Sequence, residues 1–137
     1  FVTYFTTSLD PTELLTEVRV PALAPNTGWG FEETSRRHGD LAVAASTVVG
    51  SLDRRGVCKR VAIALSGVGE VPIRAQSAEA ALLGNTPTDS LIQEAAAKVV
   101  KDIEPETDVH ATADYRRHVA IALTARALRT AFQKAKE

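Results

Sequence analysis

The order of two hydrophobic periodicities constrains this chain more than any other feature. From Trp29 to about residue 66 the apolar side chains tend to alternate, as in half-buried strands. From residue 77 onward they recur every three or four residues, as in helices. Strands followed by helices are typical of an α+β domain. The sequence therefore predicts a small antiparallel sheet of three to four strands, covered on one face by three helices.

The first two predicted strands differ in polarity. Residues 30–37 form a mostly polar candidate, whereas residues 41–52 are rich in Val, Ala and Thr and are apolar on both alternating faces. A segment that is apolar on both faces is typical of a central strand. The alanine content of residues 41–52 leaves a helix open as an alternative.

A hairpin loop joins the second predicted strand to a third. Residues 53–56 (DRRG) have the length and the glycine of such a loop. The next run places Val61, Ile63 and Leu65 on one face and stops at residues 67–69 (GVG). Because the loop is short, the two strands should pair antiparallel.

Two shorter helices are predicted before the last one. The first covers residues 77–83, with Gly84 where a C-terminal cap belongs. The second starts with Thr86 as N-cap and Pro87 at the first helical position, and Pro105 ends it. Its apolar residues at helical spacing are Leu91, Ile92, Ala95, Val99 and Ile103.

The third predicted helix starts near Thr112 and is basic on its polar side. Its apolar stripe consists of Ile121, Ala125, Leu128 and Phe132. Its arginines are Arg116, Arg117, Arg126 and Arg129. A solvated face is the simpler interpretation of these arginines, and an interaction surface is the alternative.

Residues 1–25 are expected to be the tail of a preceding domain and a linker, and residues 26–137 the domain itself. Residues 14–20 alternate partly and predict a strand, and Pro21 and Pro25 then mark a loop. The sequence contains no methionine and starts with Phe1. We therefore expect this chain to be part of a longer polypeptide.

Charge and cysteine content disfavour several classes of protein. The 137 residues carry 16 Lys and Arg against 17 Asp and Glu, whereas nucleic-acid-binding domains usually have a basic excess. No apolar run approaches the ~20 residues that span a bilayer, and the N-terminus does not resemble a signal peptide. The single cysteine, Cys58, favours a reducing, cytoplasmic setting.

The sequence shows no recognisable catalytic motif. The sequence contains no GxSxG, HExxH, CxxC or GxxxxGK[ST] motif. Cys58 is expected to be a buried small residue, and the glycines at 67 and 69 a turn at a strand end. His38 and Asp40 are too few ligands for a metal site, and His110 and His118 favour structural or solvated roles.

One loop does not fit a purely structural interpretation. Two arginines and a carboxylate, Arg36, Arg37 and Asp40, surround Gly39 between two predicted strands. Such a loop offers charge, hydrogen-bond donors and close backbone approach to a polar planar or anionic ligand. A salt-bridged turn would use the same residues, so both interpretations stay open.

The same loop carries a family resemblance. The run FEETSRRHGDLA at residues 31–42 resembles the start of the C-terminal domain of the FAD-binding, or medium, subunit of molybdenum hydroxylases. That family includes aerobic carbon monoxide dehydrogenase and xanthine dehydrogenase. Matching segments follow in the family's order: ELLTEVRVP at 13–21, GVGEVPIR at 67–74, Glu79, Leu83-Gly84, ADYRR at 113–117 and Ala120.

The resemblance implies one part of a multi-component oxidoreductase that is inactive alone. In the family, electrons pass from a molybdenum cofactor in a large subunit, through 2Fe-2S clusters in a small subunit, to FAD and then to an acceptor. The glycine-rich loops that hold most of the FAD precede the region seen here. The C-terminal domain is implied to cover the flavin, and the fold implied is the predicted α+β one. A free-standing binding or assembly module without flavin is the alternative.

The resemblance also implies roles for individual residues. Arg36 and Asp40 become polar neighbours of the flavin and Leu41 an apolar contact at the ring, while Arg37 either joins them or holds the loop by an ion pair. Xanthine-oxidising relatives carry a lysine where this chain has Glu32. Because a carboxylate stabilises an electron-rich flavin less, Glu32 is the weakest of these implied contacts.

Overall fold

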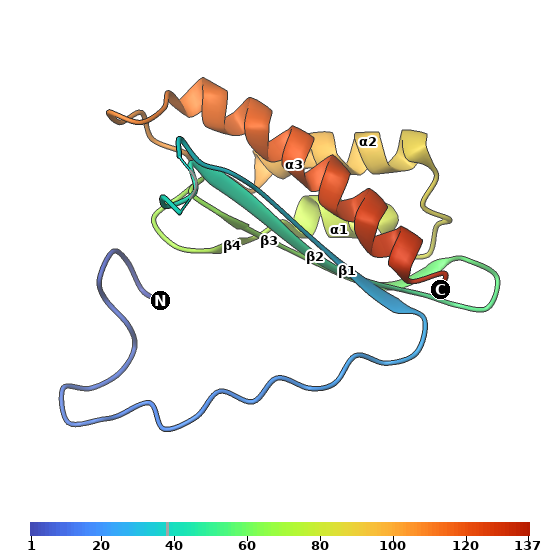
Figure 1. Cartoon of the computed structure of the whole chain (residues 1–137), viewed down its shortest axis with the longest axis horizontal. Coiled ribbons are helices and arrows are strands. Elements are labelled where there is room, and N and C mark those ends of the chain that lie inside the picture. Colours follow the sequence, from blue (N-terminus) through green and yellow to red (C-terminus); the bar gives the residue numbers. More distant parts are fainter. Residues whose placement is uncertain (38) are drawn as a thin grey trace.

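The predicted α+β architecture is confirmed by the computed structural model, which describes residues 1–37 and 39–137. Its four strands form one antiparallel sheet in chain order, and its helices cover one face of that sheet (Figure 1). The elements are β1 (Thr27–Thr34), β2 (Ala44–Leu52), β3 (Cys58–Ser66), β4 (Ile73–Arg74), α1 (Gln76–Leu82), α2 (Asp89–Ala97), the 3-10 helix η1 (Lys98–Lys101) and α3 (Ala113–Lys134). None of the described helices is long and apolar enough to cross a bilayer.

The central hairpin is as the sequence predicts. β2 is a strand and not a helix, and it pairs antiparallel with β3 across the loop at residues 53–56. Gly56 has a φ of +79°, and Asp53 accepts hydrogen bonds from two backbone amides of the loop. Val61, Ile63 and Leu65 are all buried on the helix-covered face. β2 starts three residues later than expected because residues 41–43 belong to the preceding loop.

β1 lies unusually close to α3. It starts at Thr27, three residues before the predicted start, and ends at Thr34 instead of residue 37. A Cβ on Gly28 or Gly30 would overlap the carbonyl oxygen of Ala131 or Ala127, respectively. Glycines on the strand and alanines on the helix therefore let the two backbones meet, which is why a segment that resembles a loop in sequence is a strand.

The start of α2 corrects a prediction. Its N-cap is Thr88 and not Thr86: the Thr88 side chain accepts a hydrogen bond from the amide of Leu91 at 3.2 Å. Pro87 therefore precedes the cap and is not the first helical residue. Thr88 has extended backbone angles, φ −71° and ψ 161°, so the helix cannot include it. Gly84 follows α1 with a φ of +77°, as expected, but the C-cap residue is Leu83, and the Gly84 amide donates to the Cys58 carbonyl at 2.9 Å.

The end of α2 also differs from the prediction. The helix stops at Ala97 and tightens into η1, well before Pro105. Asp102 then accepts hydrogen bonds from the backbone amide and the hydroxyl of Ser77, both at 2.9 Å. Because Asp102 is used to hold the start of α1, the chain leaves the helix there. Ile103 is still buried in the core.

α3 starts after Thr112, as predicted, but its buried face is wider than the predicted stripe. Ile121 is only half-buried. The buried residues of α3 are Arg116, Ala120, Leu123, Thr124, Ala125, Ala127, Leu128, Ala131 and Phe132. Arg116 is therefore not part of a solvated face, because the first turn of α3 lies against the ends of β2 and β3.

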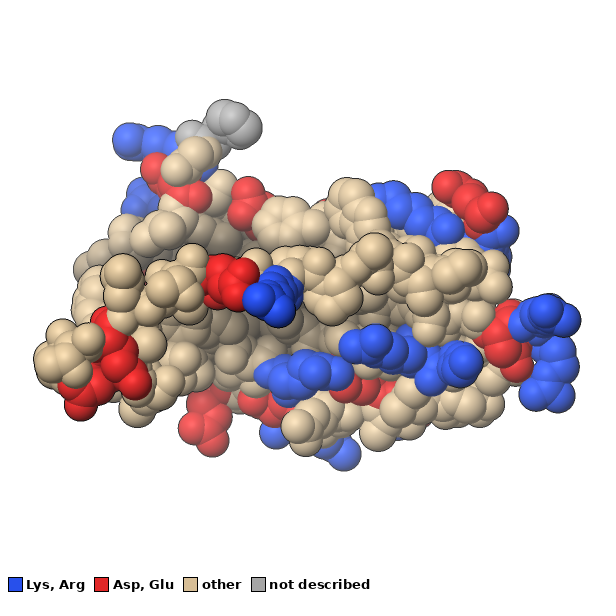
Figure 2. Space-filling model, turned by 90° about the horizontal axis from the view of Figure 1, so that it is seen from below, with Lys and Arg blue, Asp and Glu red and all other residues tan. Residues whose placement is uncertain are grey.

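The strand predicted at residues 14–20 does not form. Residues 7–26 run exposed beneath the sheet, and the one pairing described before β1 is a bridge between Thr3 and Thr6 (Figure 1). Alternation alone does not make a strand, because a strand needs a neighbour for its backbone groups. Seen from below, this side shows broad uncharged areas crossed by a row of Lys and Arg side chains (Figure 2).

Candidate functional site

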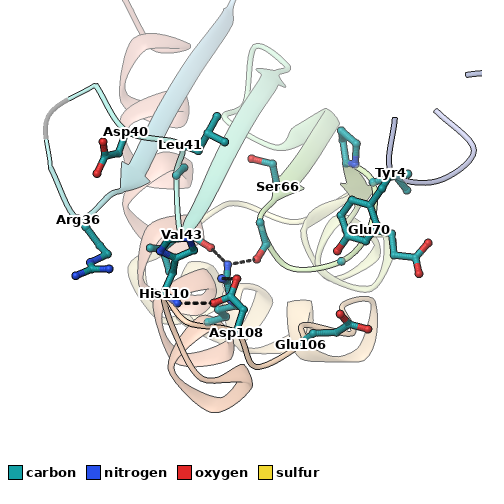
Figure 3. A pocket seen from close by; sticks show the side chains of 16 residues that line it. Tyr4, Arg36, Asp40, Leu41, Val43, Ser66, Glu70, Glu106, Asp108 and His110 are labelled. Carbon is teal, nitrogen blue, oxygen red and sulfur yellow. Dashed lines mark hydrogen bonds and ion pairs between the residues drawn. The ribbon is translucent and has the colours of Figure 1, made fainter. Parts of the chain in front are cut away.

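A cavity of about 720 Å³ lies at the end of the sheet where β1 and β3 finish. We call it the end pocket. Three loops form its walls: residues 36 and 40–43 between β1 and β2, residues 66, 67 and 69–72 after β3, and residues 106, 108 and 110 before α3. Tyr4 and Arg116 complete the lining (Figure 3). The pocket therefore gathers segments that are far apart in the sequence.

Three of the predicted site residues line the end pocket. Arg36, Asp40 and Leu41 come from one loop, and the labelled side chains of Tyr4 and Glu70 lie across from them (Figure 3). Leu41 is 96% exposed, so an apolar side chain is held in solvent beside two charged groups. The structure thus brings together three of the residues that the sequence singled out.

The loop at residues 35–42 is held by its backbone. The Asp40 amide and the Ser35 hydroxyl both donate to the Arg37 carbonyl, at 3.2 and 2.8 Å. Gly39 has a φ of +88°, a region that favours glycine. Among the described residues, neither Arg36 nor Arg37 forms an ion pair. His38 lies outside the described residues.

Glu32 and Arg37 do not line the end pocket. Glu32 is half-buried in β1, opposite Ser46, on the face of the sheet that carries the helices. Arg37 is exposed and contributes only its carbonyl oxygen to the turn. The structure thus separates these two residues from the pocket-lining group.

Arg116 and Asp108 form the centre of the pocket wall, a pairing that the sequence did not predict. Nη1 of Arg116 donates to the carbonyl oxygens of Val43 at 2.5 Å and Gly67 at 2.8 Å, and Nη2 donates to Oδ2 of Asp108 at 2.7 Å. Arg116 is 7% exposed. No local pattern indicates this burial, because Val43 and Gly67 are distant in the sequence.

Asp108 holds the loop before α3. Its Oδ1 accepts from the amides of His110 and Ala111 at 2.8 and 2.9 Å, and its Oδ2 accepts from Arg116. The bonds from the Ala111 and His110 amides, together with the one from Arg116, lower the pKa of Asp108 from 3.8 to about 2. The carboxylate therefore stays charged throughout the neutral range.

Because this pKa is lowered on folding, Asp108 stabilises the folded chain above pH 3.8, and that contribution disappears as the pH falls toward about 2. We expect Asp108→Asn to unfold at a lower urea concentration than the wild type at neutral pH. The gap between the two midpoints should close progressively in acid. Urea titrations of both proteins from pH 7 to pH 2 measure this, and a gap that does not change with pH would contradict it.

The chemistry of the end pocket suits a neutral planar ring better than a phosphate. The carboxylates of Asp40, Glu70, Glu106 and Asp108 outnumber the two arginines in the lining. Thr3 donates to Glu70 at 2.8 Å, which ties the N-terminal segment to this wall. Leu41, Val71 and Pro72 supply apolar surface. These residues could contact the ring of a flavin, whereas a flavin's phosphates would need donors from elsewhere.

Metal-binding and nucleophilic groups have little part in this site. The described residues contain no group of three His, Cys, Asp or Glu side chains that could hold a metal ion. Cys58 is buried, as expected, and burial raises the pKa of its thiol to about 11. His110 and His118 are both exposed, in agreement with solvated roles.

Comparison with known proteins identifies the family. The sequence profile of the family described as CO dehydrogenase flavoprotein C-terminal domain matches residues 29–131. The chain belongs to this family. The family includes medium chains of molybdenum-containing dehydrogenases, so the resemblance that the sequence carries at residues 31–42 is confirmed.

Individual relatives support the same assignment. The chain is 38% identical to 6-hydroxypseudooxynicotine dehydrogenase complex subunit alpha of Paenarthrobacter nicotinovorans and 34% identical to the carbon monoxide dehydrogenase medium chain of Hydrogenophaga pseudoflava. A solved structure of carbon monoxide dehydrogenase from Hydrogenophaga pseudoflava superimposes with a TM-score of 0.92 at 37% identity. Each match covers 98% of this chain and 46% of the other, so this flavoprotein domain spans about half the length of its relatives.

Proposed function

We propose that this chain is the C-terminal part of the FAD subunit of a molybdenum-hydroxylase-type oxidoreductase. Its role is to cover the flavin and support electron transfer through it to an acceptor. The observation that carries the proposal is the gathering of Arg36, Asp40 and Leu41 on one wall of the end pocket, in a domain of the flavoprotein family. The chain is not a catalyst alone in this proposal.

The FAD would accept and release electrons, and the residues of this chain would shape its surroundings. Leu41 projects an apolar side chain that can contact a ring and exclude water from it. Arg36 and Asp40 place opposite charges near the same surface, where each changes the free energy of adding an electron. Glu32 lies outside the pocket, so we propose no flavin contact for it.

The rest of the proposed enzyme follows from the relatives. We propose that residues 1–25 end a preceding FAD-binding domain and that residues 26–137 form the C-terminal domain. The other partners would be a large subunit with the molybdenum cofactor and a small subunit with 2Fe-2S clusters. The names of relatives, such as carbon monoxide dehydrogenase medium chain, support a multi-subunit assembly. A cytoplasmic location, compatible with the single thiol of Cys58, is part of the proposal.

Opposite charge changes in the end pocket test this proposal. Asp40→Ala removes a negative charge and should raise the midpoint potential of the flavin, whereas Arg36→Ala removes a positive charge and should lower it. We expect either charge to change the free energy of flavin reduction by on the order of 1 kcal/mol. For a two-electron couple this corresponds to roughly 20 mV in midpoint potential. The measurement is a dithionite titration of the assembled complex, followed by its visible absorption.

Arg37→Ala is the matched control, because Arg37 neighbours Arg36 in the same loop but does not line the pocket. It removes the same charge and should shift the potential less than Arg36→Ala. Equal shifts in the two arginine variants, or shifts of one sign in Asp40→Ala and Arg36→Ala, would contradict the proposed covering role. A complex without flavin absorbance would favour the binding or assembly module instead.

A further inference from the structure

The loop that carries Asp40 and Leu41 is anchored at one residue, Val43, through both its amide and its carbonyl. Its two ends meet where the Val43 amide donates to the Thr34 carbonyl at 2.7 Å. The Val43 carbonyl accepts from Nη1 of Arg116 at 2.5 Å. Val43 is 6% exposed, whereas Asp40 and Leu41 are exposed. The position of the exposed part of the loop therefore depends on how firmly Val43 is held.

Arg116 holds Val43 together with two other segments of the chain. The same nitrogen donates to the Gly67 carbonyl after β3, and the other terminal nitrogen donates to Asp108 before α3 (Figure 3). A guanidinium is planar and presents several N–H donors in a fixed arrangement. One side chain of α3 thus connects the three loops that form the pocket walls.

Gly67 shows how closely these loops are drawn together. Its φ is +73°, and a Cβ at this position would overlap the Val43 carbonyl oxygen. The two carbonyls that Arg116 binds therefore sit side by side only because residue 67 has no side chain. The close approach of Val43 and Gly67 is thus what allows one donor, Arg116, to bind both carbonyls.

The energetics of Arg116 indicate a role in geometry more than in stability. A buried charge loses hydration, and its interactions often do little more than offset that loss. Nε of Arg116 is buried and has no hydrogen-bond partner among the residues that the structure describes. A buried donor without a partner costs free energy. Arg116 therefore fixes the positions of Val43, Gly67 and Asp108 relative to one another.

We propose that Arg116 is a positioning residue for the flavin-covering loop. Through the Val43 carbonyl it sets where Asp40 and Leu41 stand in the end pocket, and Asp108 holds the guanidinium in place. The consequence for the flavin rests on the proposed function. The consequence for the loop does not, because it follows from contacts within this chain.

The test is amide hydrogen exchange in the full-length subunit within its complex, with Arg116→Gln and Arg116→Lys. Loss of the bond to Val43 should speed exchange of the Val43 amide by about tenfold relative to the Ile63 amide in the sheet core. Lysine carries its three N–H donors on one nitrogen and lacks the planar two-nitrogen fork of arginine, so Arg116→Lys should hold the loop only in part and show a smaller change of the same kind. Arg116→Lys also keeps the positive charge, so it provides a second measurement if Arg116→Gln does not fold.

Arg117→Gln is the matched control. Arg117 is the next residue of α3, and its ion pair with Asp114 at 2.9 Å lies on the helix surface. It should leave the ratio of Val43 to Ile63 exchange unchanged. If both Arg116 variants leave this ratio at the wild-type value, or raise exchange equally at both amides, Arg116 has only a general structural role and the proposal is wrong.

A flavin measurement on the same samples separates this inference from the proposed function. Arg116→Gln should change the flavin midpoint potential in the dithionite titration, whereas Arg117→Gln should not. If the complex contains no flavin, the proposed function fails, and the exchange ratio still decides whether Arg116 positions the loop. If the ratio changes and the potential of a bound flavin does not, Arg116 still positions the loop, but the loop does not act on the flavin and the proposed covering role is wrong.

Discussion

Replacing Gly30 with alanine is expected to lower the free energy of unfolding by about 3 kcal/mol or more. The new Cβ would overlap the backbone carbonyl of Ala127 in α3, and backbone of a long helix cannot move aside as a side chain can. To remove this overlap, β1 and α3 would have to separate along a contact in which both are buried. Urea unfolding followed by circular dichroism measures the loss.

Gly50→Ala is the comparison for Gly30→Ala, because the same substitution there should cost less stability. Gly50 lies in β2 and faces the same helix, but its Cβ would meet the edge of the Phe132 ring at 2.9 Å. A ring can shift by a few tenths of an ångström, so we expect a clearly smaller loss for Gly50→Ala than for Gly30→Ala. Equal losses would show that the cost comes from general overpacking and not from the contact between the two backbones.

Replacing Glu79 with alanine is expected to lower the free energy of unfolding by about 2–4 kcal/mol. Glu79 is 8% exposed, and its Oε1 accepts from the buried amide of Ile63 at 2.8 Å. The same carboxylate binds Nε of Arg74 and, at 3.0 Å, its Nη2. Alanine would leave the Ile63 amide without a partner and a cavity beside β3. We attribute little of the loss to Arg74, because its side chain is 54% exposed.

Glu94→Ala is the control for Glu79→Ala, because it makes the same substitution in a helix. Glu94 is exposed and pairs with Lys98 at 2.8 Å along α2. Its removal should change stability only slightly, since exposed ion pairs contribute little. Urea titrations of both variants give the comparison, and a similar small change at both positions would show that the Ile63 amide finds another partner.

The elements of this fold were predictable where their signals are local. An apolar run marked β2, alternation marked β3, and the loop DRRG marked the hairpin between them. The glycine turn at Gly84 after α1 and the Thr112 cap before α3 were also visible, because each depends on a few neighbouring residues. The choice between Thr86 and Thr88 as N-cap was not, because both residues have the same capping chemistry and only packing separates them.

The candidate site was predictable in part. The loop residues Arg36, Asp40 and Leu41 stood out by their composition and by resemblance, and the structure places all three on the end pocket. The two carbonyls that Arg116 binds are 73 and 49 residues away, so its burial left no local trace in the sequence. For that reason an arginine that resembled part of a solvated face proved to be the centre of the pocket wall.

The sequence by itself determined the α+β class, the order of strands and helices, and the loop that faces the end pocket, because periodicity, caps and turn residues act over a few positions. Only the tertiary structure decided the exposed course of residues 7–26, the contact between β1 and α3, and the convergence of three loops on Arg116. These features depend on which distant backbones meet. Hydrogen bonds and close packing between such backbones form only once the chain has folded.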